Sequence, residues 1–167
     1  MHCLKNKKQE SCDMKTAIVY YSKHHGNTKK LLDAITRDHE VTLINAAEKE
    51  AERDLSAYDR IGFASGIYYA SFAKPLLKYA KENLPKGRKT FLIYTCGSKK
   101  NRRKYTQEIH QIIIEKGSGL FGSYGCYGHD SFGPLKLVGG IRKHHPDQNE
   151  IDGAIKFYNG LSKKDLK

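Results

Sequence analysis

The stretch Thr16-Ala-Ile-Val-Tyr-Tyr-Ser-Lys-His-His-Gly-Asn-Thr28 joins an apolar run, a short polar turn and the start of a helix. Residues 16–21 are mostly β-branched or aromatic, which is typical of a strand buried on both faces of a parallel sheet. After the turn the apolar residues follow a helical period, so that Leu31 and Ile35 share one face. This pattern predicts a strand, a turn of about six residues and a helix in direct succession.

The turn has the composition of an anion-binding loop. A helix N-terminus offers backbone N–H groups without intrahelical partners and the positive end of the helix dipole. Gly26 can turn neighbouring amides inward, Ser22, Asn27 and Thr28 add side-chain donors, and Lys23 adds a positive charge. We therefore expect the loop to bind a phosphate. The alternative is that Asn27 only caps the helix and Gly26 only relieves strain.

The rest of the chain repeats this alternation of strand and helix. Further strands are predicted at 40–45, 58–66, 90–95 and 120–127. Further helices are predicted at 47–55, 74–84, 102–116 and 147–161, the last opening with the capping box Asp147-x-x-Glu150. Right-handed crossovers between parallel strands place helices on both sides of a sheet. The pattern therefore predicts a doubly wound α/β fold with a five-stranded parallel sheet.

Length and composition indicate one domain. Of the 167 residues, 1–13 are polar and lack periodicity, so we expect a disordered N-terminal extension before a folded domain at 14–167. The chain shows neither an apolar run long enough for a bilayer nor the apolar core of a secretion signal, and we expect a cytoplasmic protein without membrane association. The cysteines lack the paired spacing of a zinc site and are expected to be free thiols.

The motif Tyr-Ser-x-x-x-Gly-Asn-Thr at residues 21–28 resembles the phosphate-binding loop of the flavodoxins, small proteins that bind FMN. Gly26, Asn27 and Thr28 match the usual loop of that family, whereas Lys23 and His25 stand where hydroxyl residues are usual. The resemblance implies a flavodoxin-like three-layer sandwich with strand order 2-1-3-4-5. It also implies an FMN site outside the carboxyl ends of strands one and three.

The resemblance implies three loops around the flavin. In the loop at 65–72 either Tyr68 or Tyr69 is expected to stack on the ring, which adds roughly 0.5–1.5 kcal/mol beyond area burial; alternatively these tyrosines pack on the following helix. The loop at 95–98 is expected to meet the pyrimidine end. The second wall stays open, because no tyrosine follows until Tyr105. The predicted cofactor-binding residues are Ser22, Lys23, His24, His25, Gly26, Asn27, Thr28, Ser65, Gly66, Ile67, Tyr68, Tyr69, Thr95, Cys96, Gly97 and Ser98.

A fourth loop, at 127–146, is too long for a plain connection and is expected to be a lid or a binding segment. Its histidines, His129, His144 and His145, lack the spacing of a known metal site, so we favour loop packing over a metal. Cys96 lacks an assignable base and is interpreted as a small packed residue rather than a nucleophile.

These observations favour an FMN-binding electron-transfer flavoprotein of the flavodoxin type. The flavin ring performs the chemistry, so no catalytic side chain is predicted. The first alternative is an FMN-dependent NAD(P)H or quinone reductase, which would use the long fourth loop to dock its substrate. The second is a cofactor-free binding module with a basic surface.

The formal net charge of +12 bears on the partner. Lys99, Lys100, Arg102, Arg103 and Lys104 follow the loop that should border the flavin, and cations there are expected to favour its reduced, anionic form. We expect a redox partner protein with an acidic face. No nucleic-acid motif accompanies the cluster, so nucleic acid is not expected as a ligand.

Overall fold

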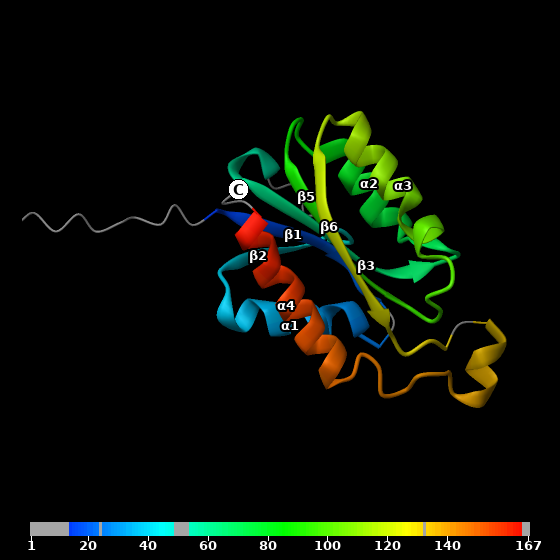
Figure 1. Cartoon of the computed structure of the whole chain (residues 1–167). Coiled ribbons are helices and arrows are strands. Elements are labelled where there is room, and N and C mark those ends of the chain that lie inside the picture. Colours follow the sequence, from blue (N-terminus) through cyan, green and yellow to red (C-terminus); the bar gives the residue numbers. More distant parts are fainter. Residues whose placement is uncertain (1–13, 24, 49–53, 132, 165–167) are drawn as a thin grey trace, which may run out of the picture.

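The computed structural model of the chain describes residues 14–23, 25–48, 54–131 and 133–164. A parallel sheet forms the middle layer of a three-layer sandwich (Figure 1). Its strands are β1 (Thr16–Tyr21), β2 (Val41–Asn45), β3 (Arg60–Tyr68), β5 (Lys89–Cys96) and β6 (Gly119–Tyr127). They lie in the order β2-β1-β3-β5-β6. The predicted order 2-1-3-4-5 is confirmed, because β5 and β6 are the fourth and fifth strands of the parallel sheet.

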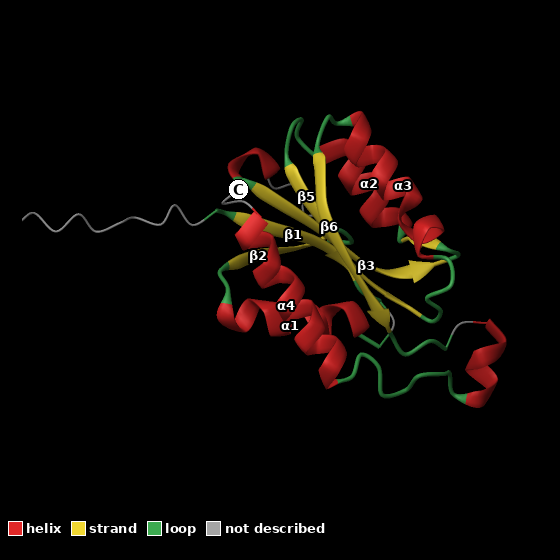
Figure 2. Cartoon of the chain, in the orientation of Figure 1, coloured by secondary structure: helices red, strands yellow, loops and turns green. Residues whose placement is uncertain are grey.

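A short additional strand, β4 (Ser71–Phe72), lies beside the end of β3 (Figure 2). The two strands pair antiparallel, with Tyr68 opposite Ser71 and Ile67 opposite Phe72. β3 therefore continues beyond Gly66, where the sequence pattern ended the strand. The segment expected to be a loop at 65–72 is a hairpin that projects from the carboxyl edge of the sheet.

Helices cover both faces of the sheet. They are α1 (Asn27–Asp38), α2 (Lys74–Asn83), α3 (Arg102–Glu115) and α4 (Gln148–Lys164). α1 and α4 lie on one face, and α2 and α3 lie on the other (Figure 1). This confirms the helices predicted at 27 onward, 74–84, 102–116 and 147–161 within a residue or two at most boundaries. None of the described helices combines the length and the apolar composition needed to cross a membrane.

The helix predicted at 47–55 falls mainly outside the described residues, since 49–53 are not described. The described residues on either side form a turn at 46–48 and a 3-10 helix, η1 (Leu55–Ala57). Asp54 caps η1 by accepting a hydrogen bond from the Ser56 amide at 2.9 Å. Leu55 is buried, as predicted, but its burial is achieved from this short 3-10 turn.

Neighbouring residues of β1 pack on opposite faces of the sheet. Ala17 and Val19 belong to the core beneath α2 and α3, whereas Ile18 belongs to the core beneath α1 and α4. Because both faces are buried, the strand is apolar along most of its length instead of alternating with polar residues. The same arrangement brings the carboxyl end of β1 and the start of α1 to one edge of the molecule.

Glycines in the strands make room for aromatic rings. A Cβ atom on Gly62 of β3 would overlap the fully buried ring of Phe91, and one on Gly125 of β6 would overlap the ring of Tyr94. By contrast, a Cβ on Gly160 of α4 would meet no heavy atom within 4 Å. The first two glycines are required by packing and the third is not.

We expect Gly62→Ala and Gly160→Ala to change stability in opposite directions. Overpacking against Phe91 should lower the free energy of unfolding by about 1–3 kcal/mol. In α4, alanine should raise it by roughly 0.5–1 kcal/mol, because glycine is the poorer helix former and the site is open. Urea unfolding of both variants beside the parent measures this; a stable Gly62→Ala protein would contradict the packing account.

Cys96 and Cys126 lie in the cores on opposite faces of the sheet. Burial raises the pKa of both thiols, and that of Cys126 to about 12. The stability associated with the protonated Cys126 thiol is fully present below its ordinary pKa of 9.0 and is lost as pH rises towards 12, because the unfolded chain ionises first.

Replacing Cys126 by alanine should therefore flatten the alkaline loss of stability. One thiol contributes a slope of up to about 1.4 kcal/mol per pH unit between pH 9 and 11. Urea unfolding across that range should show a shallower decline for Cys126→Ala than for the parent, whatever the absolute stability of the variant. Parallel declines would show that the thiol ionises equally easily in both states.

Candidate functional site

A cavity of about 720 Å³ opens at the carboxyl edge of the sheet. The predicted site residues that line it are Ser22, Asn27, Thr28, Gly66, Ile67, Tyr68, Tyr69, Thr95, Cys96, Gly97 and Ser98. Lys23, His25, Gly26 and Ser65 are near this edge but are not among the lining residues, and His24 lies outside the described residues. Segments far apart in the sequence thus converge where parallel strands of this fold end.

The turn before α1 is shaped to present its amides. His25 and Gly26 both have left-handed backbone conformations, with φ of 55° and 63°. Gly26 is the N-cap, its carbonyl accepts the first helical hydrogen bond from the Lys30 amide at 3.0 Å, and it offers no side chain to cap the helix. The first turn of α1 also contains no acidic residue. The Ser22 hydroxyl accepts from the Lys29 amide at 3.4 Å, and the positive end of the helix dipole favours an anion there.

The first two residues of α1 are buried and tied to distant segments. Thr28 Oγ1 lies 3.1 Å from Thr95 Oγ1, which joins α1 to the end of β5. Asn27 Nδ2 donates to the His129 carbonyl at 2.9 Å. Asn27 Oδ1 is buried and has no hydrogen-bond partner among the described residues. Since buried acceptors in folded proteins are normally satisfied, this oxygen favours a ligand that carries a hydroxyl or amide donor.

The β3–β4 hairpin turns through Tyr69 and Ala70, whose φ values are 50° and 62°. Positive φ at both central residues is the geometry of a type I′ turn, which normally uses Asn or Gly. A bulky residue there is strained, and such strain is concentrated at functional sites. Ser65 stabilises the base of the hairpin through two hydrogen bonds. Its hydroxyl accepts from the Ala73 amide at 3.1 Å and donates to the Gly66 carbonyl at 2.6 Å.

The two tyrosines of the hairpin differ in exposure and contacts. Tyr68 is half-buried, its ring meets Tyr21 edge-on at 5.9 Å between centroids, and its hydroxyl accepts from the Lys23 amide at 3.5 Å. Tyr69 is 84% exposed. Both line the cavity. The hairpin therefore contacts the turn before α1 through Tyr68 and presents an accessible ring at Tyr69.

Residues 128–131 and 133–147, which we call the lid, form a wall of the cavity. The lid contains a 3-10 helix, η2 (Gly133–Val138), and an antiparallel bridge between Asp130 and Ile141. His129 stacks on His25 at 3.7 Å between ring centroids, and His25 Nε2 lies 2.8 Å from Ser131 Oγ. The lid residues that line the cavity are Gly128, His129, Asp130, Ser131, Gly133, Lys136 and Ile141. The long loop expected at 127–146 thus lies against the cavity, but none of its lining residues was among the predicted cofactor-binding residues.

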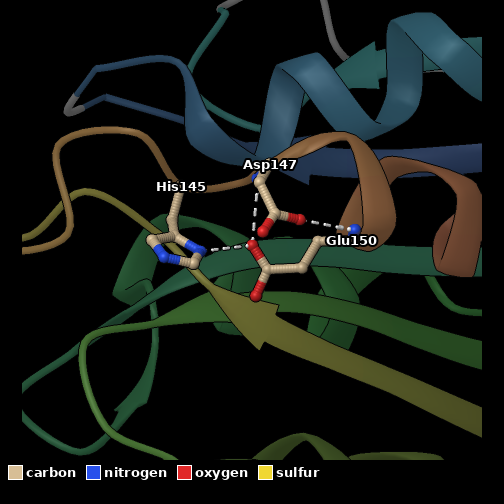
Figure 3. Close-up of side chains that lie close together, drawn as sticks. All are labelled: His145, Asp147 and Glu150. Atoms are coloured by element: carbon tan, nitrogen blue, oxygen red, sulfur yellow. Dashed lines mark hydrogen bonds and ion pairs between the residues drawn. The ribbon is translucent and has the colours of Figure 1, made fainter.

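The lid is anchored where α4 begins (Figure 3). The Glu150 amide donates to Asp147 Oδ1 at 2.9 Å and the Asp147 amide donates to Glu150 Oε2 at 3.0 Å, which confirms the predicted capping box. Glu150 also binds His145 Nδ1 at 2.7 Å and the Tyr127 amide at 3.0 Å. Among the described residues, His145, Asp147 and Glu150 are close enough to hold a metal. Their hydrogen bonds account for the grouping as a helix cap.

The residues of the basic cluster at 99–104 are not among those that line the cavity. Lys99 points its ammonium at Glu150, 3.8 Å away, and at the ring of Tyr127, 4.1 Å from the centroid. The other cluster members, Lys100, Arg102, Arg103 and Lys104, are exposed. Among the described residues that line the cavity, the cation is Lys136 of the lid. Tyr105 also lines it, from the first turn of α3.

A family model described as a flavodoxin domain matches residues 18–117. An uncharacterized protein of Methanocaldococcus jannaschii is 31% identical over 150 residues, which cover 90% of this chain and 99% of that protein.

Solved structures share the fold along nearly the whole chain. A flavodoxin from the domain Archaea has a TM-score of 0.62 at 17% identity, covering 89% of this chain and 97% of that one. A Fusobacterium nucleatum flavodoxin bound to flavin mononucleotide has a TM-score of 0.64 at 14% identity, covering 90% and 99%. Because the family model spans more than half of the sequence, this protein belongs to the flavodoxin family.

Proposed function

We propose that this protein binds FMN in the cavity and acts as an electron carrier of the flavodoxin type. The observation that carries the proposal is the N-terminus of α1, where the N-cap Gly26 has no side chain and the first turn has no acidic residue, beside a cavity walled by Tyr68, Tyr69 and Gly97. Membership of the flavodoxin family and the flavin mononucleotide bound by the F. nucleatum relative support it. When bound, the flavin ring supplies the redox chemistry, which the protein's side chains cannot perform alone.

The residues present suit the parts of FMN. The amides at the start of α1, with Ser22 and Thr28, suit the doubly charged phosphate. The unsatisfied Oδ1 of Asn27 suits a hydroxyl of the ribityl chain. The aromatic hairpin and the small residues of the 95–98 loop suit a flat ring that approaches the backbone closely. The protein's part is to bind the cofactor, fix its orientation and exclude water from one face.

The main alternative is an FMN-dependent reductase of NAD(P)H or quinones. It is favoured by the lid, which adds Lys136, His129 and Ile141 to the cavity and so offers contacts for a second small molecule. Rapid reduction of the flavin by NADH or NADPH without another protein would support this alternative. A purified protein without the visible absorption of a flavin, and unable to take it up, would instead support a cofactor-free binding module.

For the carrier we propose a partner protein with an acidic face. The formal charge is +12, and exposed cations follow the cavity wall at Lys100, Arg102 and Arg103. Complementary charges raise association rates and select between partners, and the effect weakens with salt. The carrier should therefore exchange electrons with its partner more slowly as ionic strength rises.

We expect Gly26→Val to weaken FMN binding at least tenfold, a loss of about 1.4 kcal/mol. Valine is disfavoured at φ of +63°, so the turn should open and misdirect its amides. The matched control is Gly117→Val, at φ of +60° after α3, where a Cβ likewise meets nothing within 4 Å. Titration of the apo-proteins with FMN measures the difference. Equal affinities for both variants would mean that the turn does not hold the phosphate.

We expect Tyr68→Ala or Tyr69→Ala to relieve the quenching of flavin fluorescence, because one of these rings stacks on the flavin. The lost stacking and buried area should weaken binding by about 1 kcal/mol or more. Tyr68→Phe is the control that removes the hydroxyl contact to the Lys23 amide and keeps the ring. If fluorescence and affinity are unchanged in both alanine variants, the stacking wall lies elsewhere in the cavity.

A further inference from the structure

Arg142 of the lid has a backbone conformation that arginine rarely adopts. Its φ is 57°, in the left-handed region. For an L-residue with a Cβ this conformation is strained, and it persists only where surrounding contacts fix it. The contacts of Arg142 are therefore expected to hold it in this conformation.

Those contacts lead to the cavity wall. Nε of Arg142 donates to the Gly97 carbonyl at 2.8 Å, and its guanidinium carbon lies 3.7 Å from the centroid of the Tyr127 ring. The ammonium of Lys99 lies 4.1 Å from the same centroid and 3.8 Å from Glu150. The Tyr127 ring at the end of β6 thus contacts two cations, Lys99 from the segment after β5 and Arg142 from the lid.

Gly97 is fixed from another direction as well. The Asp130 carboxylate lies so close to its α-carbon that any Cβ there would collide with it. The preceding carbonyl, of Cys96, accepts from the Gly128 amide at 3.1 Å. The wall at residues 96–97 is therefore held by lid groups on both sides, and Arg142 supplies the charged hydrogen bond.

We propose that Arg142 is a positioning residue that fixes the Gly97 wall and makes the electrostatic potential there more positive. The proposal rests on the function proposed above. Reduction of FMN by two electrons with uptake of one proton gives the anionic hydroquinone, whose extra negative charge is on the ring. A guanidinium bound to the wall carbonyl stabilises that form more than the neutral oxidised ring. The nearby carboxylates of Asp130 and Glu150 oppose this effect, and Lys99 and Lys136 add to it.

The test compares Arg142→Gln with Lys143→Gln, the neighbouring exposed cation of the same lid. Both variants lose one positive charge, but only the first loses the contact to Gly97. Titration with dithionite and FMN should show that Arg142→Gln lowers the hydroquinone-to-oxidised affinity ratio at least tenfold. A tenfold change in that ratio corresponds to a shift of about 30 mV in a two-electron midpoint potential. Lys143→Gln should change it less than threefold.

Two further measurements separate position from charge. Arg142→Lys keeps the charge and loses the planar donor, so it should recover part of the shift. The Gly128 amide joins the lid to Cys96, and the Asp130 amide bonds to Ile141 within the lid. In the apo-protein, Arg142→Gln should speed hydrogen exchange of both amides, while Lys143→Gln should not. Equal potentials and equal exchange rates in the two glutamine variants would overturn the proposal. A parent protein that binds no FMN would instead overturn the proposed function, and the exchange experiment would still test the positioning role.

Discussion

The hydrogen bond from Asn27 Nδ2 to the His129 carbonyl is the contact on which the site depends, because it joins residues 102 positions apart in the sequence. It secures the start of α1 to the lid, while the Thr28–Thr95 contact secures it to β5. The backbone of Gly128 lies so close to the Asn27 amide that a Cβ there would reach within 2.8 Å of Nδ2. One buried side chain thus joins the turn before α1 to the lid, two segments that both line the cavity.

The sequence predicted those parts of the fold that depend on local pattern. The apolar run at 16–21 follows from burial of the strand on both faces, and the helical spacing of Leu31 and Ile35 follows from burial of one helix face. Both patterns can be recognised from the sequence alone. The capping box at Asp147 and Glu150 is also local, and it is present as predicted. The extension of β3 into a hairpin was not predictable in this way, because its turn uses Tyr69 and Ala70 at positive φ where Asn or Gly would signal it.

The candidate site was predictable where it depends on one loop and not where it depends on tertiary contacts. Ser22, Asn27 and Thr28 line the same cavity as the residues at 66–69 and 95–98, as the strand order requires. The charges near the cavity did not follow from their proximity in sequence. Lys99 lies beside Cys96–Ser98 in the chain yet is directed to Glu150, whereas Arg142, from a distant segment, contacts Gly97. The signal that could have pointed to Arg142 was the length and cationic composition of the lid.

Both ends of the lid are attached to one carboxylate, since Glu150 accepts from the amides of Tyr127 and Asp147. A loop whose ends are closed in this way can change length at low cost, because closure entropy grows only with the logarithm of the number of residues. The outer turn at Gly133–Val138, with Leu137 91% exposed, reaches the cavity through Gly133 and Lys136. Insertions and deletions there would remodel that part of the cavity while the contacts at the start of α1 stayed in place, so the shape of the cavity can change among relatives without loss of the fold.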